Sequence, residues 1–91
     1  MAKLYKTNGE VYEIIPADGK KFTLEEAQKY VNGYYVELVK LKHREQLICN
    51  EEAICLDMPY NKKATEVLAK SYGEDCQCLY GDIIHCLRKE F

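Results

Sequence analysis

Tryptophan is absent from this 91-residue chain, and so is any long apolar run. A membrane-spanning helix needs roughly 18 consecutive apolar residues, and no window of the sequence approaches that length. The opening MAKLYKTNGE also lacks the apolar core of a secretory signal peptide. We therefore expect a single cytoplasmic domain over residues 1–91, with no membrane partner.

A basic stripe is missing as well. The chain has 13 Lys and Arg against 15 Asp and Glu, which gives a formal net charge of −2, and its cations are scattered in short pairs. Proteins that bind nucleic acids draw much of their affinity from neutralised phosphates, which requires clustered cations. We therefore expect no nucleic acid among the partners.

Motifs for cofactors, metals and activated nucleophiles are also missing. There is no C-x-x-C pair, no G-x-G-x-x-G loop and no Walker pattern. No nucleophile signature accompanies His43 or His85, and His85 is expected on the sheet face or at a strand edge. We expect no cofactor, no metal and no catalytic residue, and hence a protein that is not an enzyme.

The five cysteines are an odd number, which fits poorly with a closed disulfide framework. In the cytosol they are expected to be reduced thiols. Alternation along a strand would place Cys76 and Cys78 on one face, whereas the adjacent His85 and Cys86 would point to opposite faces. A thiol-dependent or metal-dependent activity at the C-terminal cysteines stays an alternative. Small buried apolar side chains are the expected role of Cys49, Cys55 and Cys86.

The clearest local signal is the segment KLYKTNGEVYEII at the start of the chain. Asn8-Gly9 favours a two-residue turn, because both central positions of that turn require a positive φ. Such a turn would set Tyr5 opposite Tyr12, with Ile14 on the same face. A β-hairpin is therefore predicted here.

Two helices are predicted from the residues at their ends. Thr23 and Glu26 form a capping-box pattern for the first helix, and Gly33 would supply the left-handed residue that ends it. Asn61 is the N-cap candidate of the second helix, which Gly73 would end.

The remaining segments are typical of short strands joined by turns. They are 34–41, 46–49 and 53–57 around Asn50-Glu51-Glu52, and 76–80 and 83–89 around Gly81-Asp82. The order ββ-α-βββ-α-ββ predicts an α+β fold with a mainly antiparallel sheet built from hairpins. We expect the two helices to pack on one face of that sheet.

Short motifs spread over nearly the whole chain carry a family resemblance. They are Thr23-Leu24-Glu25-Glu26, Gly33-Tyr34-Tyr35-Val36-Glu37, Asn50-Glu51-Glu52, Met58-Pro59-Tyr60-Asn61 and Gly81-Asp82-Ile83. With these motifs the chain resembles a family of small uncharacterised proteins of bacteriophages and mobile elements, described only as a domain of unknown function. Met58 stands where the family usually has Leu, and the cysteines do not resemble a family feature. The resemblance implies a phage or mobile-element context inside a bacterial host, and it implies no activity.

One segment has the chemistry of a small-anion site. The second helix is expected to begin at Asn61, so its free backbone N–H groups would lie beside the ammonium groups of Lys62 and Lys63. Tyr60 and the Gly81-Asp82 turn would lie next to them. A small anionic, nucleotide-type ligand is therefore one hypothesis for the function.

The eight tyrosines favour a different hypothesis. They cannot all be buried in so small a domain, and exposed tyrosines are common at protein interfaces. The interface candidates are Tyr34, Tyr35, Tyr72 and Tyr80. We expect the chain to act by protein binding or by self-association, with a host or defence factor as one kind of partner.

Overall fold

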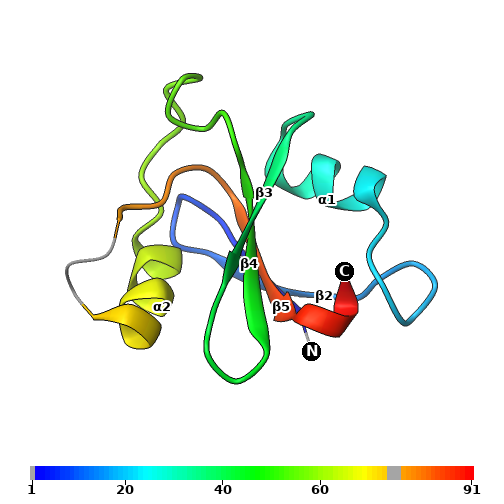
Figure 1. The fold of residues 1–91 in the computed structure, drawn as a ribbon. Coiled ribbons are helices and arrows are strands. Elements are labelled where there is room, and N and C mark those ends of the chain that lie inside the picture. Colours follow the sequence, from blue (N-terminus) through cyan, green and yellow to red (C-terminus); the bar gives the residue numbers. More distant parts are fainter. Residues whose placement is uncertain (1, 74–76) are drawn as a thin grey trace.

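The computed structural model describes residues 2–73 and 77–91, and its centre is a five-stranded antiparallel sheet in the order β2-β1-β5-β4-β3 (Figure 1). The strands are β1 Ala2–Tyr5, β2 Val11–Ile14, β3 Val36–Lys40, β4 Glu45–Asn50 and β5 Ile83–Leu87. Two α-helices, α1 Leu24–Val31 and α2 Lys62–Tyr72, pack on the sheet, and a short 3-10 helix, η1 Arg88–Glu90, follows β5. The predicted α+β class is confirmed.

The two helices cover opposite faces of the sheet, so the expectation that both cover one face is wrong (Figure 1). Helix α1 packs against the face that contains Ile48 and Ile84. Helix α2 packs against the face that contains Leu47 and Ile83. Successive side chains of a strand point to opposite faces, so the continuous apolar pairs in β4 and β5 require cover on both sides.

The first hairpin has a three-residue loop in place of the predicted two-residue turn. The N–H of Lys6 donates to the carbonyl of Glu10 at 2.9 Å, and only Gly9 takes the left-handed conformation, with φ at 94°. The register is therefore shifted by one residue, and Leu4 lies opposite Tyr12. A one-residue shift moves a side chain to the other face, so Tyr5 and Tyr12 do not share a face.

Helix α1 begins as predicted and ends differently. Thr23 accepts from the N–H of Glu26, and Glu26 accepts from the N–H of Thr23, so the capping box is confirmed. The left-handed residue at the other end is Asn32, with φ at 59°, and not Gly33. Gly33 is small for a different reason: a Cβ there would lie 2.2 Å from Nδ2 of the buried Asn50 side chain.

Helix α2 has both of its predicted ends, with Asn61 as the N-cap and Gly73 as the C-cap. Two predicted strands do not form. Residues 51–57 make consecutive turns, and the Oδ1 of Asn50 accepts from the N–H of Glu52 at 2.8 Å to start them. Of the predicted strand 76–80, residue 76 lies outside the described residues, and Tyr80 makes an isolated bridge with Tyr60. The last strand ends at Leu87, where η1 begins.

Candidate functional site

Asn61 is wholly buried and all of its amide atoms are used inside the protein. Its Nδ2 donates to the carbonyls of Tyr5 at 2.9 Å and Gly81 at 2.8 Å, and its Oδ1 accepts from the N–H of Ala64 at 3.1 Å. The side chain thereby ties the start of α2 to the end of β1 and to the turn before β5. Asn61 consequently has no free side-chain donor for an anionic ligand.

The other residues of the predicted anion site have mixed surroundings. The Asp82 carboxylate is buried and accepts from the N–H of Thr7 at 3.0 Å and from Nδ2 of Asn32 at 3.2 Å. It also pairs with the ammonium of Lys6 at 3.0 Å, and this hydrogen bond raises the pKa of Lys6. An anion near the turn would meet this negative charge. The exposed members of the predicted set are Tyr60, Lys62 and Lys63.

The tyrosines proposed for an interface fall into separate groups. Tyr34 and Tyr35 are 76% and 56% exposed, and their ring centroids lie 5.3 Å apart. Tyr80 is half-buried and contacts the ring of Tyr60 at 6.0 Å. Tyr72 is exposed, and its hydroxyl donates to the carbonyl of Lys40. The first group directly precedes β3, and Tyr72 contacts the other end of that strand.

Strand β3 is an edge of the sheet, and alternate residues direct their backbone groups outward. The carbonyl of Tyr35 accepts from Glu51 at 3.0 Å, and the N–H of Leu41 donates to Glu45 at 2.9 Å, so odd-numbered residues face β4. In an antiparallel ladder the intervening residues then face away from the neighbouring strand. The N–H and C=O groups of Val36, Leu38 and Lys40 therefore point out of the sheet.

Apolar side chains lie at the same edge and beside its first residue. Leu38 is 45% exposed on β3 itself. The turn segment 51–57 carries the exposed Ile54 and Leu56, and the bond from Glu51 to Tyr35 holds this segment against the loop before β3. Figure 1 shows both loops at the same end of the molecule. Exposed apolar groups beside unpaired backbone are typical of a protein-binding surface.

The cysteines do not converge on a common point. Cys49 and Cys86 are buried on opposite faces of the sheet, as small apolar residues are. Cys55 is exposed, contrary to its expected burial, because residues 51–57 form turns and no strand. Cys78 is also exposed, and Cys76 lies outside the described residues. The prediction that Cys76 and Cys78 share one face of a strand therefore involves a residue outside the described part of the chain.

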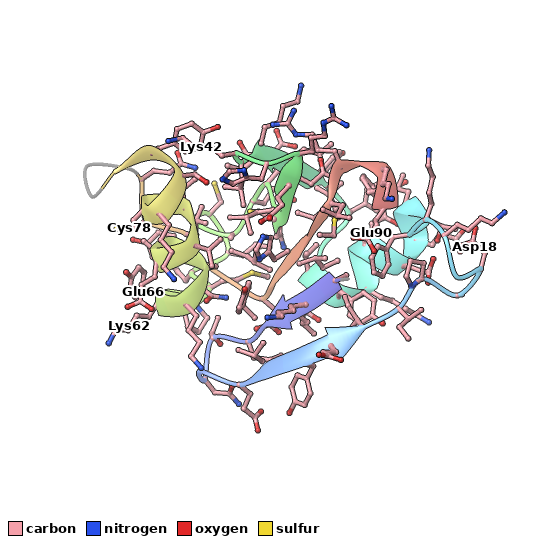
Figure 2. The ribbon with its side chains drawn as sticks, turned by 90° about the horizontal axis from the view of Figure 1, so that it is seen from below. Asp18, Lys42, Lys62, Glu66, Cys78 and Glu90 are labelled. Carbon is pink, nitrogen blue, oxygen red and sulfur yellow. The ribbon has the colours of Figure 1, made fainter. Side chains whose placement is uncertain are left out.

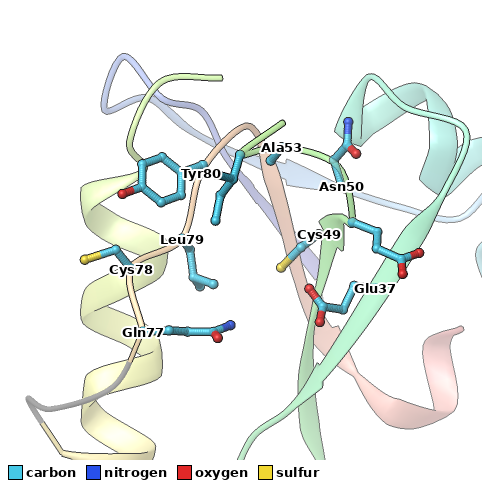
Figure 3. Close-up of a pocket in the computed structure, with 10 residues that line it drawn as sticks. Glu37, Cys49, Asn50, Ala53, Gln77, Cys78, Leu79 and Tyr80 are labelled. Atoms are coloured by element: carbon cyan, nitrogen blue, oxygen red, sulfur yellow. The ribbon is translucent and has the colours of Figure 1, made fainter. Parts of the chain in front are cut away.

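A cleft of about 310 Å³ lies between the β3–β4 pair and the segment before β5, and Figure 3 shows Cys49 and Cys78 at its sides. The Cys49 thiol lies across from the Glu37 carboxylate inside the cleft, and the Cys78 thiol points away from it. Burial, and then the Glu37 charge, raise the pKa of Cys49 to about 12, so this thiol stays protonated and unreactive. Burial likewise raises the pKa of Cys86 to about 11. Among the described residues, no group of three or more His, Cys, Asp or Glu is placed to hold a metal ion.

Comparison with known proteins identifies the family. No helix within residues 2–73 or 77–91 is long and apolar enough to cross a membrane. Searches of the curated proteins and of the solved structures found no match. The model of one family, a domain of unknown function (DUF3846), matches residues 3–90, almost the whole chain. The chain therefore belongs to the DUF3846 family.

Proposed function

We propose that this protein is a non-enzymatic accessory protein of a phage or mobile element, which acts in the bacterial cytoplasm by pairing strand β3 with a strand of a protein partner. The observation that carries the proposal is the outer edge of β3, where Val36, Leu38 and Lys40 direct their backbone groups away from the sheet. An exposed strand edge is a template for another strand, and backbone pairing at such an edge is a common mode of protein recognition.

The simplest partner is a second copy of the chain. Antiparallel pairing of two β3 strands about Leu38 aligns the outward-facing residues of one copy with those of the other. Glu37 would then lie opposite Val39, and Val36 opposite Lys40, so no like charges are directly opposed. The partly exposed Leu38 side chains would face each other across the twofold axis and become buried. Self-pairing therefore satisfies the outward-facing backbone groups of Val36 and Leu38 and buries the exposed apolar side chain, and it requires the Lys40 carbonyl to exchange the Tyr72 hydroxyl for the partner strand.

A proline substitution tests the proposal without removing a hydrogen bond of the sheet. The N–H of Leu38 faces outward, so Leu38→Pro leaves the β3–β4 ladder intact and blocks the edge. The matched control is Glu13→Pro on β2, the opposite edge, where the bond between Lys6 and Glu10 shows that Glu13 also faces outward. Circular dichroism verifies that both variants are folded.

Analytical ultracentrifugation across a concentration series then measures self-association. We expect the wild type and Glu13→Pro to form dimers and Leu38→Pro to remain monomeric. A wild-type protein that stays monomeric at high micromolar concentration would refute self-pairing. If the partner is instead a host or defence factor that pairs with β3, Glu13→Pro should still bind it and Leu38→Pro should not. Equal binding of that partner by both variants would refute the role of this edge.

A further inference from the structure

Three side chains form a hydrogen-bonded chain across neighbouring strands on the face that α2 covers. The Oη of Tyr5 on β1 lies 3.0 Å from Nδ1 of His85 on β5, and Nε2 of His85 lies 2.6 Å from Oε1 of Glu45 on β4. The Tyr5 ring also stacks on the imidazole, with centroids 5.8 Å apart. Because each residue comes from a different strand of one sheet, the sheet holds the three groups in a fixed geometry.

These groups form the floor of a cleft of about 320 Å³, a volume within the range of small-molecule sites. Val67, Lys70 and Ser71 of α2 line one side, and the turn between β3 and β4 lines the other. Figure 2 shows Lys42 of this turn beside the C-terminal end of α2, and the N–H of Lys42 donates to the hydroxyl of Ser71. The cleft is therefore closed at its sides by two different elements.

The charge around the cleft is mostly positive. The ammonium groups of Lys42 and Lys70 line it beside the His43 imidazole, while its carboxylate, Glu45, is already bound to His85. A second hollow of about 500 Å³ shares His43 and continues the positive surface. Its other lining residues are Arg44, Leu87, Arg88 and Lys89. In a chain whose net charge is negative, this concentration of cations favours an anionic ligand.

The turn that lines the cleft is a tight hairpin turn between β3 and β4. His43 and Arg44 both adopt the left-handed conformation, with φ at 62° and 60°, and the N–H of Glu45 donates to the carbonyl of Lys42 at 3.3 Å. Two left-handed central residues are what such a turn requires, so the hairpin fixes the backbone at this side of the cleft.

We propose that this cleft binds a small phosphomonoester, whose phosphate lies among Lys42, His43 and Lys70 and accepts a hydrogen bond from the Tyr5 hydroxyl. A phosphate group provides the charge and the acceptor oxygens that these cations and this buried donor require. The proposal depends on different residues from strand pairing at β3, since the cleft lies on the α2 face and not along the outer edge.

The Tyr5 hydroxyl is held in the cleft by Nδ1 of His85, whose Nε2 is in turn held by Glu45. Burial, and then the Glu45 charge, raise the pKa of Tyr5, which keeps the phenol protonated as a donor.

Calorimetric titration with AMP, adenosine and inorganic phosphate tests the assignment. We expect AMP to bind and adenosine not to bind. Phosphate that binds as tightly as AMP would overturn the assignment to a phosphomonoester, and adenosine that binds as tightly as AMP would overturn the anion site.

Two variants test whether AMP binds in this cleft. Tyr5→Phe keeps the ring and removes the hydroxyl, so AMP should bind about tenfold more weakly or worse. Tyr12→Phe, an exposed tyrosine on β2, is the matched control and should bind as the wild type does. Equal affinities for Tyr5→Phe and the wild type would refute the proposal.

Discussion

Substitution of Asn61 tests how much stability comes from the hydrogen bonds that join the start of α2 to the end of β1 and to the turn before β5. Asn61→Ala removes one N-cap, worth about 0.5–2 kcal/mol, and leaves two buried carbonyls without their donor, at about 1–3 kcal/mol each. These terms overlap, so we expect the free energy of unfolding to fall by about 3–5 kcal/mol, a large part of the roughly 5–15 kcal/mol typical of a domain. The carbonyls belong to Tyr5 and Gly81, and the cap to Ala64.

The isosteric Asn61→Asp separates the donor from the cap. It keeps an oxygen for Ala64, but its second oxygen replaces the NH2 group that faces two carbonyl oxygens in a fully buried site. The carboxyl must stay protonated there, so its folded-state pKa is raised above the unfolded value of about 3.9. The variant is therefore most stable below about pH 4 relative to the wild type, and loses stability as pH rises through the raised folded-state value.

Urea denaturation followed by circular dichroism at pH 7 and pH 5 measures both effects. Asn8→Ala is the control, because Asn8 also accepts from a backbone N–H, that of Glu10, in an exposed turn. We expect the control to lose less than about 1 kcal/mol. Two results would refute the reasoning: Asn61→Ala within 1 kcal/mol of the wild type, or Asn61→Asp with the wild-type dependence on pH.

Three further predictions use the same denaturation assay or simple labelling. Gly33→Ala should lower the free energy of unfolding by about 1–3 kcal/mol, because the added Cβ would overlap the Asn50 side chain; a neutral effect would show that Asn50 moves freely. Under native conditions a thiol reagent should label Cys55 and Cys78 rapidly and the two buried cysteines only on unfolding, so Cys55→Ser and Cys78→Ser should each remove one fast equivalent. Backbone N–H donors lower the pKa of Glu26 below 4.5, so its stabilisation is present above that pH and is lost as pH falls through the lowered folded-state value. The difference in the free energy of unfolding between the wild type and Glu26→Gln should therefore disappear as the pH is lowered, and a difference that does not change with pH would contradict this.

Local chemistry could be predicted from the sequence because its signals lie within a few residues. The capping box of Thr23 and Glu26 and the N-cap at Asn61 are confirmed, since each depends on one helical turn. The role of Gly33 could not be predicted, because the side chain that excludes a Cβ belongs to Asn50, on another element. The segment 53–57 has the composition of a strand, yet Asn50 starts a series of turns in its place.

The order of the strands in the sheet determines where the candidate surfaces lie, and that order depends on contacts between distant parts of the sequence. Strand β5, the last in the chain, lies between β1 and β4, which makes β3 and β2 the edges. A sequence pattern that predicts β3 as a strand carries no sign that one side of it is unpaired. The Tyr5–His85–Glu45 chain likewise joins residues separated by 80 and 40 positions. His85 lies on the sheet face, one of the two places that its sequence predicts, but its partners depend on three strands meeting in register.

The edge of β3 and the cleft meet at the last turn of α2, which predicts that they are coupled. The Tyr72 hydroxyl donates to the outward-facing carbonyl of Lys40, so a pairing strand must compete with it. Tyr72 follows Lys70 and Ser71, which line the cleft, and a ligand that fixes this turn should hold Tyr72 on Lys40 and weaken self-association. By thermodynamic linkage, self-association should lower the affinity for AMP by the same factor as AMP lowers the affinity of self-association. Tyr72→Phe removes the competitor, so its dimer should be tighter and insensitive to AMP. Wild-type dimers with equal dissociation constants in the presence and absence of saturating AMP would show that no such coupling exists.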